Sequence, residues 1–212
     1  MNDFPDGFPD EFPGDDGPDL DAPALIWEPA PVRGYASAQY LDNVEDVWEL
    51  KRGISVAERF PSDAAFRMDP AYPRDVRLPD VLYNLDSLLV VARDAAEAAG
   101  LAEAAHLELL DVAVYNHKDR PTERAYVIVN PLGTVDCLDL GASQVEMNPI
   151  DPDLISVCYG LAVDADRLDP ERSVFRPTHL PTRLFVTAEQ MHRLQAEAPV
   201  GSAFSSPATY TL

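Results

Sequence analysis

The pattern of apolar and polar positions predicts a chain built mainly from short β-strands. The two clearest strands are residues 107–115 (LELLDVAVY) and 125–130 (AYVIVN). The polar loop between them, residues 116–121, is of the kind that joins antiparallel neighbours, so we expect a hairpin. Residues 134–140 (TVDCLDL) follow a Pro-Leu-Gly turn and are expected to add a third strand to this meander.

Further strands are expected on both sides of the meander. Residues 88–92 (LLVVA) and 154–163 (LISVCYGLAV) have the apolar content of buried strands. Residues 173–176 and 184–186 are typical of shorter ones. Together with the meander, these segments indicate a protein whose core is mostly sheet.

Two regions have less regular patterns. Residues 44–50 (VEDVWEL) mix apolar and acidic side chains and precede Gly53, which suits either a short helix with a glycine cap or a strand that enters a turn. We favour a strand over residues 47–51. Residues 60–80 contain four prolines among aromatic side chains. This spacing is too irregular for a long helix or a central strand, so we expect an ordered loop.

Capping motifs predict two helices. The sequence DAAE at residues 94–97 has the spacing of a capping box, and Gly100 can end the helix at a positive φ. The sequence TAEQ at residues 187–190 repeats the motif and predicts a helix over residues 188–198. The buried stripe of this second helix is expected to consist of Ala188, Met191 and Leu194.

The composition indicates one folded domain with an acidic extension. With 212 residues and 46% hydrophobic content, the chain can bury one sizeable core. Residues 1–24 differ from the rest, because they repeat Phe-Pro three times, carry eight carboxylates and contain no basic residue. We expect a disordered acidic tail there. Residues 25–212 are expected to form a single α+β domain, a mostly antiparallel meander sheet with a few short helices.

The net charge of −21 narrows the class of partner. An acidic surface repels a phosphate backbone, so nucleic acid is not expected. A basic protein is the natural partner because opposite charges speed encounter, and a homodimer is left open. The longest apolar run, near residues 88–92, is too short to span a membrane. The amino terminus lacks the features of a signal peptide, so we expect a cytoplasmic protein.

Residues that carry common chemistry are present but are not arranged for it. The four histidines lack the spacing of a metal site, and no GxxxxGK, GxGxxG or GxSxG motif occurs. Cys137 and Cys158 lie in apolar surroundings typical of buried free thiols. Residues 164–169 are acidic but lack the glycine of a calcium loop. We therefore expect no enzyme, no cofactor and no catalytic or metal-binding residue, and the sequence leaves the partner-binding residues undefined.

Seven short motifs follow one another between about residues 40 and 205. They are WELxxG at residues 48–53, FPxDxxF at 60–66, PDxLxN at 79–84, NHK at 116–118, YxIVNP at 126–131, VDCLD at 135–139, and FR at 175–176 ahead of LFV. In this order they resemble the immunity protein 11 family. The Phe-Pro tail lies outside the resemblance.

The resemblance implies a small cytoplasmic protein of a bacterial polymorphic toxin system, made beside a toxin that it binds and neutralises. It brings no catalytic residues. Four residues look family-like, and each also has a structural interpretation. These are Trp48 as a core aromatic, Gly53 as a turn glycine, Asp80 as a loop carboxylate that caps backbone amides, and Asn130 as a turn residue at a strand end.

Our leading hypothesis is an immunity protein that blocks a basic toxin by steric and electrostatic occlusion. We expect its contacts on loops and on an exposed face of the meander sheet. Two alternatives stay open. One is an intracellular inhibitor or escort of a secreted enzyme, such as a protease, with the Phe-Pro tail inserted as an extended peptide. The other is a metal-dependent hydrolase that uses some of the many carboxylates.

Overall fold

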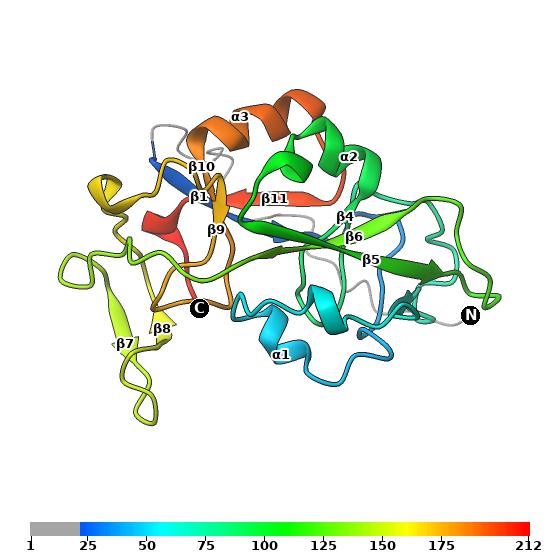
Figure 1. The fold of residues 1–212 in the computed structure, drawn as a ribbon, viewed down its shortest axis with the longest axis horizontal. Helices are drawn as coiled ribbons and strands as arrows, with labels where there is room; N and C mark the ends of the chain where they lie inside the picture. Colours follow the sequence, from blue (N-terminus) through cyan, green and yellow to red (C-terminus); the bar gives the residue numbers. More distant parts are fainter. Residues whose placement is uncertain (1–21) are drawn as a thin grey trace, which may run out of the picture.

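A computed structural model describes residues 22–212 and contains three sheets, three short α-helices and four 3₁₀-helices within that range (Figure 1). The predicted α+β class, with mostly antiparallel sheets and few short helices, is confirmed. Most of the predicted acidic tail, residues 1–21, lies outside the described residues. Ala24, assigned to the end of that tail, already begins a strand. The division into a tail and a single domain stays a prediction.

The central sheet is formed by β2 (Ala65–Arg67), β3 (Val81–Leu82), β4 (Val90–Ala92), β5 (Leu107–Tyr115) and β6 (Tyr126–Pro131). Its strand order is β2-β5-β6-β4-β3. β5 and β6 form the predicted antiparallel hairpin, with Leu110 opposite Ile128. β4 pairs antiparallel with the other edge of β6, whereas β2 lies parallel to β5.

A second sheet joins the two ends of the described chain. It is formed by β1 (Ala24–Pro29), β9 (Val174–Phe175), β10 (Phe185–Thr187) and β11 (Ser202–Ser205). The order is β11-β1-β10-β9, and all its pairs are antiparallel. Trp27 on β1 is buried and stacks on Phe204 of β11, with ring centroids 5.9 Å apart. Trp27 is therefore a packing residue, and Phe204 folds back onto the core.

Both predicted helices are present, as α2 (Arg93–Ala98) and α3 (Ala188–Glu197). Thr187 caps α3 as predicted, because its Oγ1 accepts a hydrogen bond from the backbone N–H of Gln190 at 3.3 Å. The capping box predicted for α2 is wrong, since Ala92 is the N-cap residue and no side chain caps it. Gly100 follows α2 with a φ of +70°, as predicted. In the predicted stripe of α3, two residues are buried and Ala188 is half-buried, the buried ones being Met191 and Leu194.

The central sheet is covered on both faces, because its strands alternate between two apolar clusters. Val90, Leu110 and Ile128 belong to the first cluster. Val91 and Val127 belong to the second, which also takes residues from the second sheet and from α2 and α3. In Figure 1, α2 and α3 lie above the central strands and the short helix α1 (Val47–Leu50) lies below them. Burial of these branched side chains supplies the main driving force for folding.

Two sequence predictions near the first cluster are wrong. Residues 47–51 form α1 rather than a strand, and only Leu50 of this helix is buried. A single turn suffices because it places Leu50 in the core and Val47 against it. Residues 60–80 were expected to be a loop, but they include β2, whose three residues pair in parallel with Ala113 to Tyr115 of β5. The flanking prolines limit β2 to this short length.

Two further strand predictions fail on the other side of the molecule. Residues 134–140 do not extend the meander, and β4 takes the place beside β6. Their apolar side chains pack instead in a third cluster beyond the second sheet. Residues 154–163 form a strand only over β8 (Ile155–Cys158). This strand pairs with β7 (Val145–Met147) as a separate two-stranded ribbon, which projects from the body in Figure 1.

The two cysteines lie in the third cluster. Cys137 and Cys158 are free and buried, as predicted. Burial raises the pKa of the Cys137 thiol to about 11, so at neutral pH this thiol stays protonated. The pKa of Cys158 is raised by the same cause. Among residues 22–212, no helix has the length and apolar character needed to cross a bilayer.

Candidate functional site

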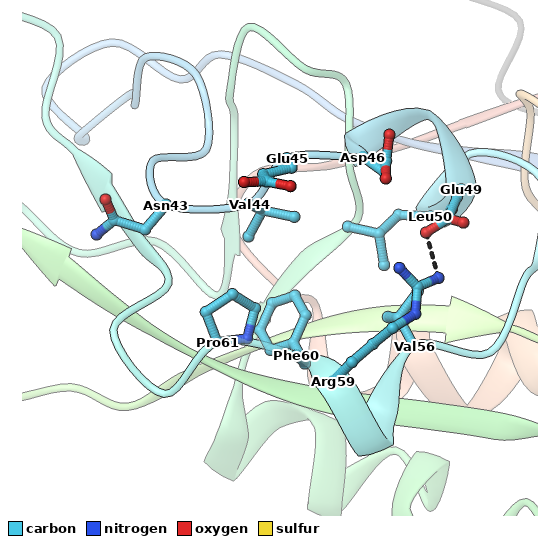
Figure 2. A pocket seen from close by; sticks show the side chains of 10 residues that line it. All are labelled: Asn43, Val44, Glu45, Asp46, Glu49, Leu50, Val56, Arg59, Phe60 and Pro61. Carbon is cyan, nitrogen blue, oxygen red and sulfur yellow. Dashed lines mark hydrogen bonds and ion pairs between the residues drawn. The ribbon is translucent and has the colours of Figure 1, made fainter.

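An open hollow lies between α1 and the short 3₁₀-helix η1 (Ala57–Arg59), as Figure 2 shows. It belongs to residues 43–61, which we call the α1–η1 segment. The hollow has a volume of about 330 Å³. The apolar part of its lining is formed by Val44, Leu50, Val56, Phe60 and Pro61, and the polar part by Asn43, Glu45, Asp46, Glu49 and Arg59. It therefore combines apolar contact area with charge.

The charge of the lining is not balanced. Glu49 forms an ion pair with Arg59 across the hollow (Figure 2). Glu45 and Asp46 are exposed, and neither forms an ion pair with any cationic group of residues 22–212. Asp46 Oδ1 only accepts a hydrogen bond from the indole N–H of Trp48, at 3.0 Å. Two carboxylates therefore remain free to attract a cation from outside.

Trp48 belongs to α1, one of the two helices that border the hollow, and is 53% exposed. The prediction that it is a core aromatic is wrong, because α1 directs Leu50 to the core and leaves Trp48 outside. The guanidinium carbon of Arg52 lies 6.0 Å from the ring centroid, within cation–π range. Large exposed indoles are uncommon on surfaces that bind nothing, because they present much apolar area to water.

Gly53 fixes the path of the chain after α1. Its φ is +67°, and an added Cβ would lie 2.6 Å from the carbonyl oxygen of Pro131. The backbone N–H of Gly133 donates to the Gly53 carbonyl at 2.8 Å. The predicted turn role is confirmed, and the contact also shows that this position tolerates only glycine.

Glu108 and Asn130 hold the next residues of the segment from below. Glu108 accepts hydrogen bonds from the backbone N–H groups of Val56 and Ala57 at 3.2 and 3.4 Å, and one from the Ser55 hydroxyl. Asn130 is buried, and its Nδ2 donates to the Ile54 carbonyl and to Glu108, both at 3.0 Å. Partial burial opposes ionisation of Glu108, but these hydrogen bonds outweigh it and lower the pKa of the carboxyl.

The sequence suggested that Asn130 is a turn residue at a strand end. It does lie near the end of β6, but it serves as a buried link between β6, Glu108 and the surface segment.

Arg176 holds α1 itself. This arginine is 4% exposed and has no carboxylate partner among the described residues. Its two terminal nitrogens donate to the carbonyls of Leu50 and Pro181 at 2.6 and 2.7 Å. Burial lowers its pKa to about 10, so it stays charged at neutral pH. A guanidinium taken out of water is costly, and here its bonds fix the last residue of α1.

Asp80 has the predicted role of a loop carboxylate that caps a backbone amide, but it lies outside the α1–η1 segment. Its Oδ2 accepts from the N–H of Val200 at 2.7 Å, and its Oδ1 accepts from Arg124 at 2.6 Å. Arg124 also pairs with Asp94 at the start of α2. This group connects loops and has no unpaired member, so it is a structural feature.

The histidines are placed on separate elements. His106 donates to the Val174 carbonyl at 3.1 Å, and His179 donates to that of Asp153 at 2.7 Å. His117 lies in the β5–β6 loop and His192 is exposed on α3. Within the described part of the chain, no group of three or more His, Cys, Asp or Glu residues is arranged to hold a metal ion.

The meander sheet offers little exposed face. β6 is buried at every position, and Asp111 is the one residue of β5 that is exposed. This sheet therefore has little surface for the contacts that we expected on its face. The loops, where we also expected contacts, offer more. The α1–η1 segment is the loop region that joins a hollow, unpaired carboxylates and an exposed indole.

These features make the α1–η1 segment a candidate recognition surface of an acidic α+β protein. The Immunity protein family (Imm11) matches residues 17–209. The chain belongs to this family, and it is an immunity protein. The resemblance deduced from the seven motifs is confirmed. The match begins at residue 17, well before residue 40, and so includes part of the predicted tail. No curated protein sequence matches the chain.

Proposed function

We propose that this immunity protein binds a cognate protein toxin and neutralises it by covering the surface on which the toxin acts. The family match over residues 17–209 is the observation that carries the proposal. The binding event itself inhibits, so no chemistry by the immunity protein is required. Protection takes place in the cytoplasm of the cell that makes the toxin.

The charge of the chain supports a basic toxin. Eight carboxylates lie in residues 1–24, which leaves a formal charge of −13 for residues 25–212. Such a surface attracts a cationic partner over several ångströms before contact and repels acidic competitors. Inhibition is therefore both steric and electrostatic.

Affinity purification of the tagged protein from the producing cell tests the proposal. We expect it to retain a basic protein that arrests growth when expressed alone and is harmless when co-expressed with the immunity protein. Raising the ionic strength from about 0.01 to 0.15 M shortens the Debye length from about 30 to 8 Å. The association rate should fall accordingly. Failure of co-expression to protect the cell would overturn the proposal, and a salt-independent association rate would overturn its electrostatic part.

A further inference from the structure

We propose that the α1–η1 hollow receives a lysine or arginine side chain of the toxin, and that Trp48 packs against the apolar surface beside that side chain. The inference rests on the proposed function and names the contact through which it is carried out. Four properties of the described residues support it: the lining of the hollow, the orientation of Trp48, the fixed backbone and the weakness of competing surfaces.

The lining matches the two halves of a long basic side chain. Such side chains bury their aliphatic stems on apolar surface and keep the charged head in a polar setting. Val44, Phe60 and Pro61 provide the apolar wall, and Glu45 and Asp46 provide carboxylates with no cationic partner. Charge-assisted hydrogen bonds to carboxylates are among the strong ones, and arginine can make two of them at once.

Trp48 is suited to be the central contact. Tryptophan is enriched among the few residues that dominate interface energies, where it fills apolar surface on the partner. Its indole N–H is held by Asp46, so the ring has a defined orientation before binding. The guanidinium of Arg52 lies near the ring. It would repel a toxin surface that is basic throughout, so it favours a single basic side chain with apolar surface beside it.

The backbone of the segment is fixed before the partner arrives. Arg176 holds the Leu50 carbonyl, Asn130 holds the Ile54 carbonyl and Glu108 holds the next amides. Loops usually lose conformational freedom on binding, which costs affinity. Here the segment loses its conformational freedom when the protein folds, because these side chains hydrogen-bond to its backbone. Binding then costs less conformational entropy.

Other surfaces lack this combination. A hollow of about 350 Å³ beside α2 also has carboxylates without an ion pair to any of residues 22–212, Glu97 and Glu123, but its lining includes Arg93 and Arg124 and no apolar side chain larger than that of Ala125. Ile150 at the tip of the β7–β8 ribbon is 93% exposed and is not among the residues that line either hollow. A second copy of this chain is a poor occupant, because two molecules of net charge −21 repel each other.

The test measures binding of the captured toxin to the full-length protein and to surface variants. Trp48→Ala should weaken affinity by at least about 30-fold, the effect of losing a dominant interface residue. Tyr159→Ala is the matched control, because Tyr159 is an aromatic residue that is 60% exposed elsewhere. It should leave the affinity unchanged.

The charge is tested with the double substitution Glu45→Gln and Asp46→Asn, which keeps the size and one acceptor oxygen of each side chain. We expect about tenfold weaker binding, mainly through slower association. Asp151→Asn with Asp153→Asn on the ribbon is the matched control and should have little effect. Glu45→Lys should be rescued by a toxin variant whose inserted basic residue is changed to glutamate.

The outcomes distinguish a failure of the proposed function from a failure of the proposed contact surface. If the wild-type protein does not bind the toxin, the proposed function fails. If it binds and neutralises the toxin while the Trp48 and Glu45/Asp46 variants match their controls, the function stands and this contact surface is wrong. Circular dichroism and thermal melting of every variant exclude misfolding as the cause of lost binding.

Discussion

The α1–η1 segment packs on the first cluster, whereas the β7–β8 ribbon projects from the body, yet both expose a large apolar side chain next to carboxylates. They are held in different ways. The ribbon tip is held mainly by local bonds, such as those from the N–H groups of Ile150 and Asp151 to Asn148 Oδ1, with one bond from a distant residue, His179, to the Asp153 carbonyl. The α1–η1 segment is held by Arg176, which lies 126 positions from Leu50, and by Asn130, 76 positions from Ile54.

The difference shows where the fold places buried polar side chains, whose removal from water costs free energy. Local turns form without help from the core, so the ribbon tip needs little support. Buried polar groups are expensive unless their bonds are satisfied. In this protein two of them, Arg176 and Asn130, connect the core to the α1–η1 segment, which is the arrangement expected where a loop has to keep its shape for a partner.

The largest expected effect breaks this connection at Arg176. Arg176→Met keeps a long side chain but leaves the carbonyls of Leu50 and Pro181 without donors. We expect the free energy of unfolding to fall by about 3 kcal/mol. Urea denaturation measures it, and hydrogen exchange should show faster opening of α1. Arg193→Met is the control, since Arg193 forms an exposed i,i+4 pair with Glu189 and should cost less than about 0.5 kcal/mol. Equal stability of both variants would show that Arg176 does not hold the segment.

A smaller effect is expected at Gly53. Gly53→Ala forces a positive φ on alanine and places Cβ against the Pro131 carbonyl, so we expect a loss of about 2–3 kcal/mol in thermal or urea unfolding. Gly34→Ala separates the two causes. Gly34 also has a positive φ, of +83°, but nothing lies within 4 Å of its Cβ position. That variant should lose only about 1 kcal/mol. If both variants lost the same stability, the contact between the added Cβ at position 53 and the Pro131 carbonyl of β6 would contribute nothing.

The sequence predicts the parts of this comparison that depend on local pattern. Residues 107–115 and 125–130 are apolar runs of strand length on either side of a polar loop, and the predicted hairpin forms there as β5 and β6. Thr187 is followed by a sequence that favours a helix, and α3 begins there. The short helix at Val47–Leu50 was one of two interpretations, and the strand was wrongly favoured because one turn carries too few residues to show a period. β2 was missed because three residues between prolines resemble a loop.

The motifs WELxxG and YxIVNP drew attention to Trp48, Gly53 and Asn130, but not to the site that these residues form or support. Trp48 looked like a core residue because aromatic side chains usually are buried, and only the direction of α1 shows that it is outside. The FR motif drew attention to Arg176 but not to its role, since its partner Leu50 is distant in sequence. Residues 134–140 alternate as a strand does, yet they pack in the third cluster without joining the central sheet.

The pH dependence of stability sharpens the comparison further. Glu108 has a lowered pKa in the folded protein, so its hydrogen bonds stabilise the fold above its ordinary value of 4.5, and this contribution is lost as the pH falls through the lower folded value. Glu108→Gln should cost about 1–2 kcal/mol at pH 7 and progressively less below about pH 4. Glu146→Gln on the exposed ribbon should change nothing at either pH. If the stability lost in Glu108→Gln did not depend on pH, the hydrogen bonds to the ionised carboxylate would not be its cause.

The smallest effect concerns the residues before β1. Deletion of residues 1–21 removes eight carboxylates, so association with a basic toxin should slow by a few-fold at low salt. The dissociation rate and the protection of cells should stay the same, as surface plasmon resonance and growth assays can show. Loss of protection would favour the alternative in which the Phe-Pro segment itself is inserted into the target.

The stoichiometry of inhibition tests most directly whether this protein works by occupying its partner. The purified toxin is titrated with the immunity protein at concentrations far above the dissociation constant, and residual toxin activity is measured. Occupation predicts a linear loss of activity that ends at a fixed molar ratio. Complete inactivation by a small fraction of an equivalent would reveal turnover by an enzyme and contradict the account.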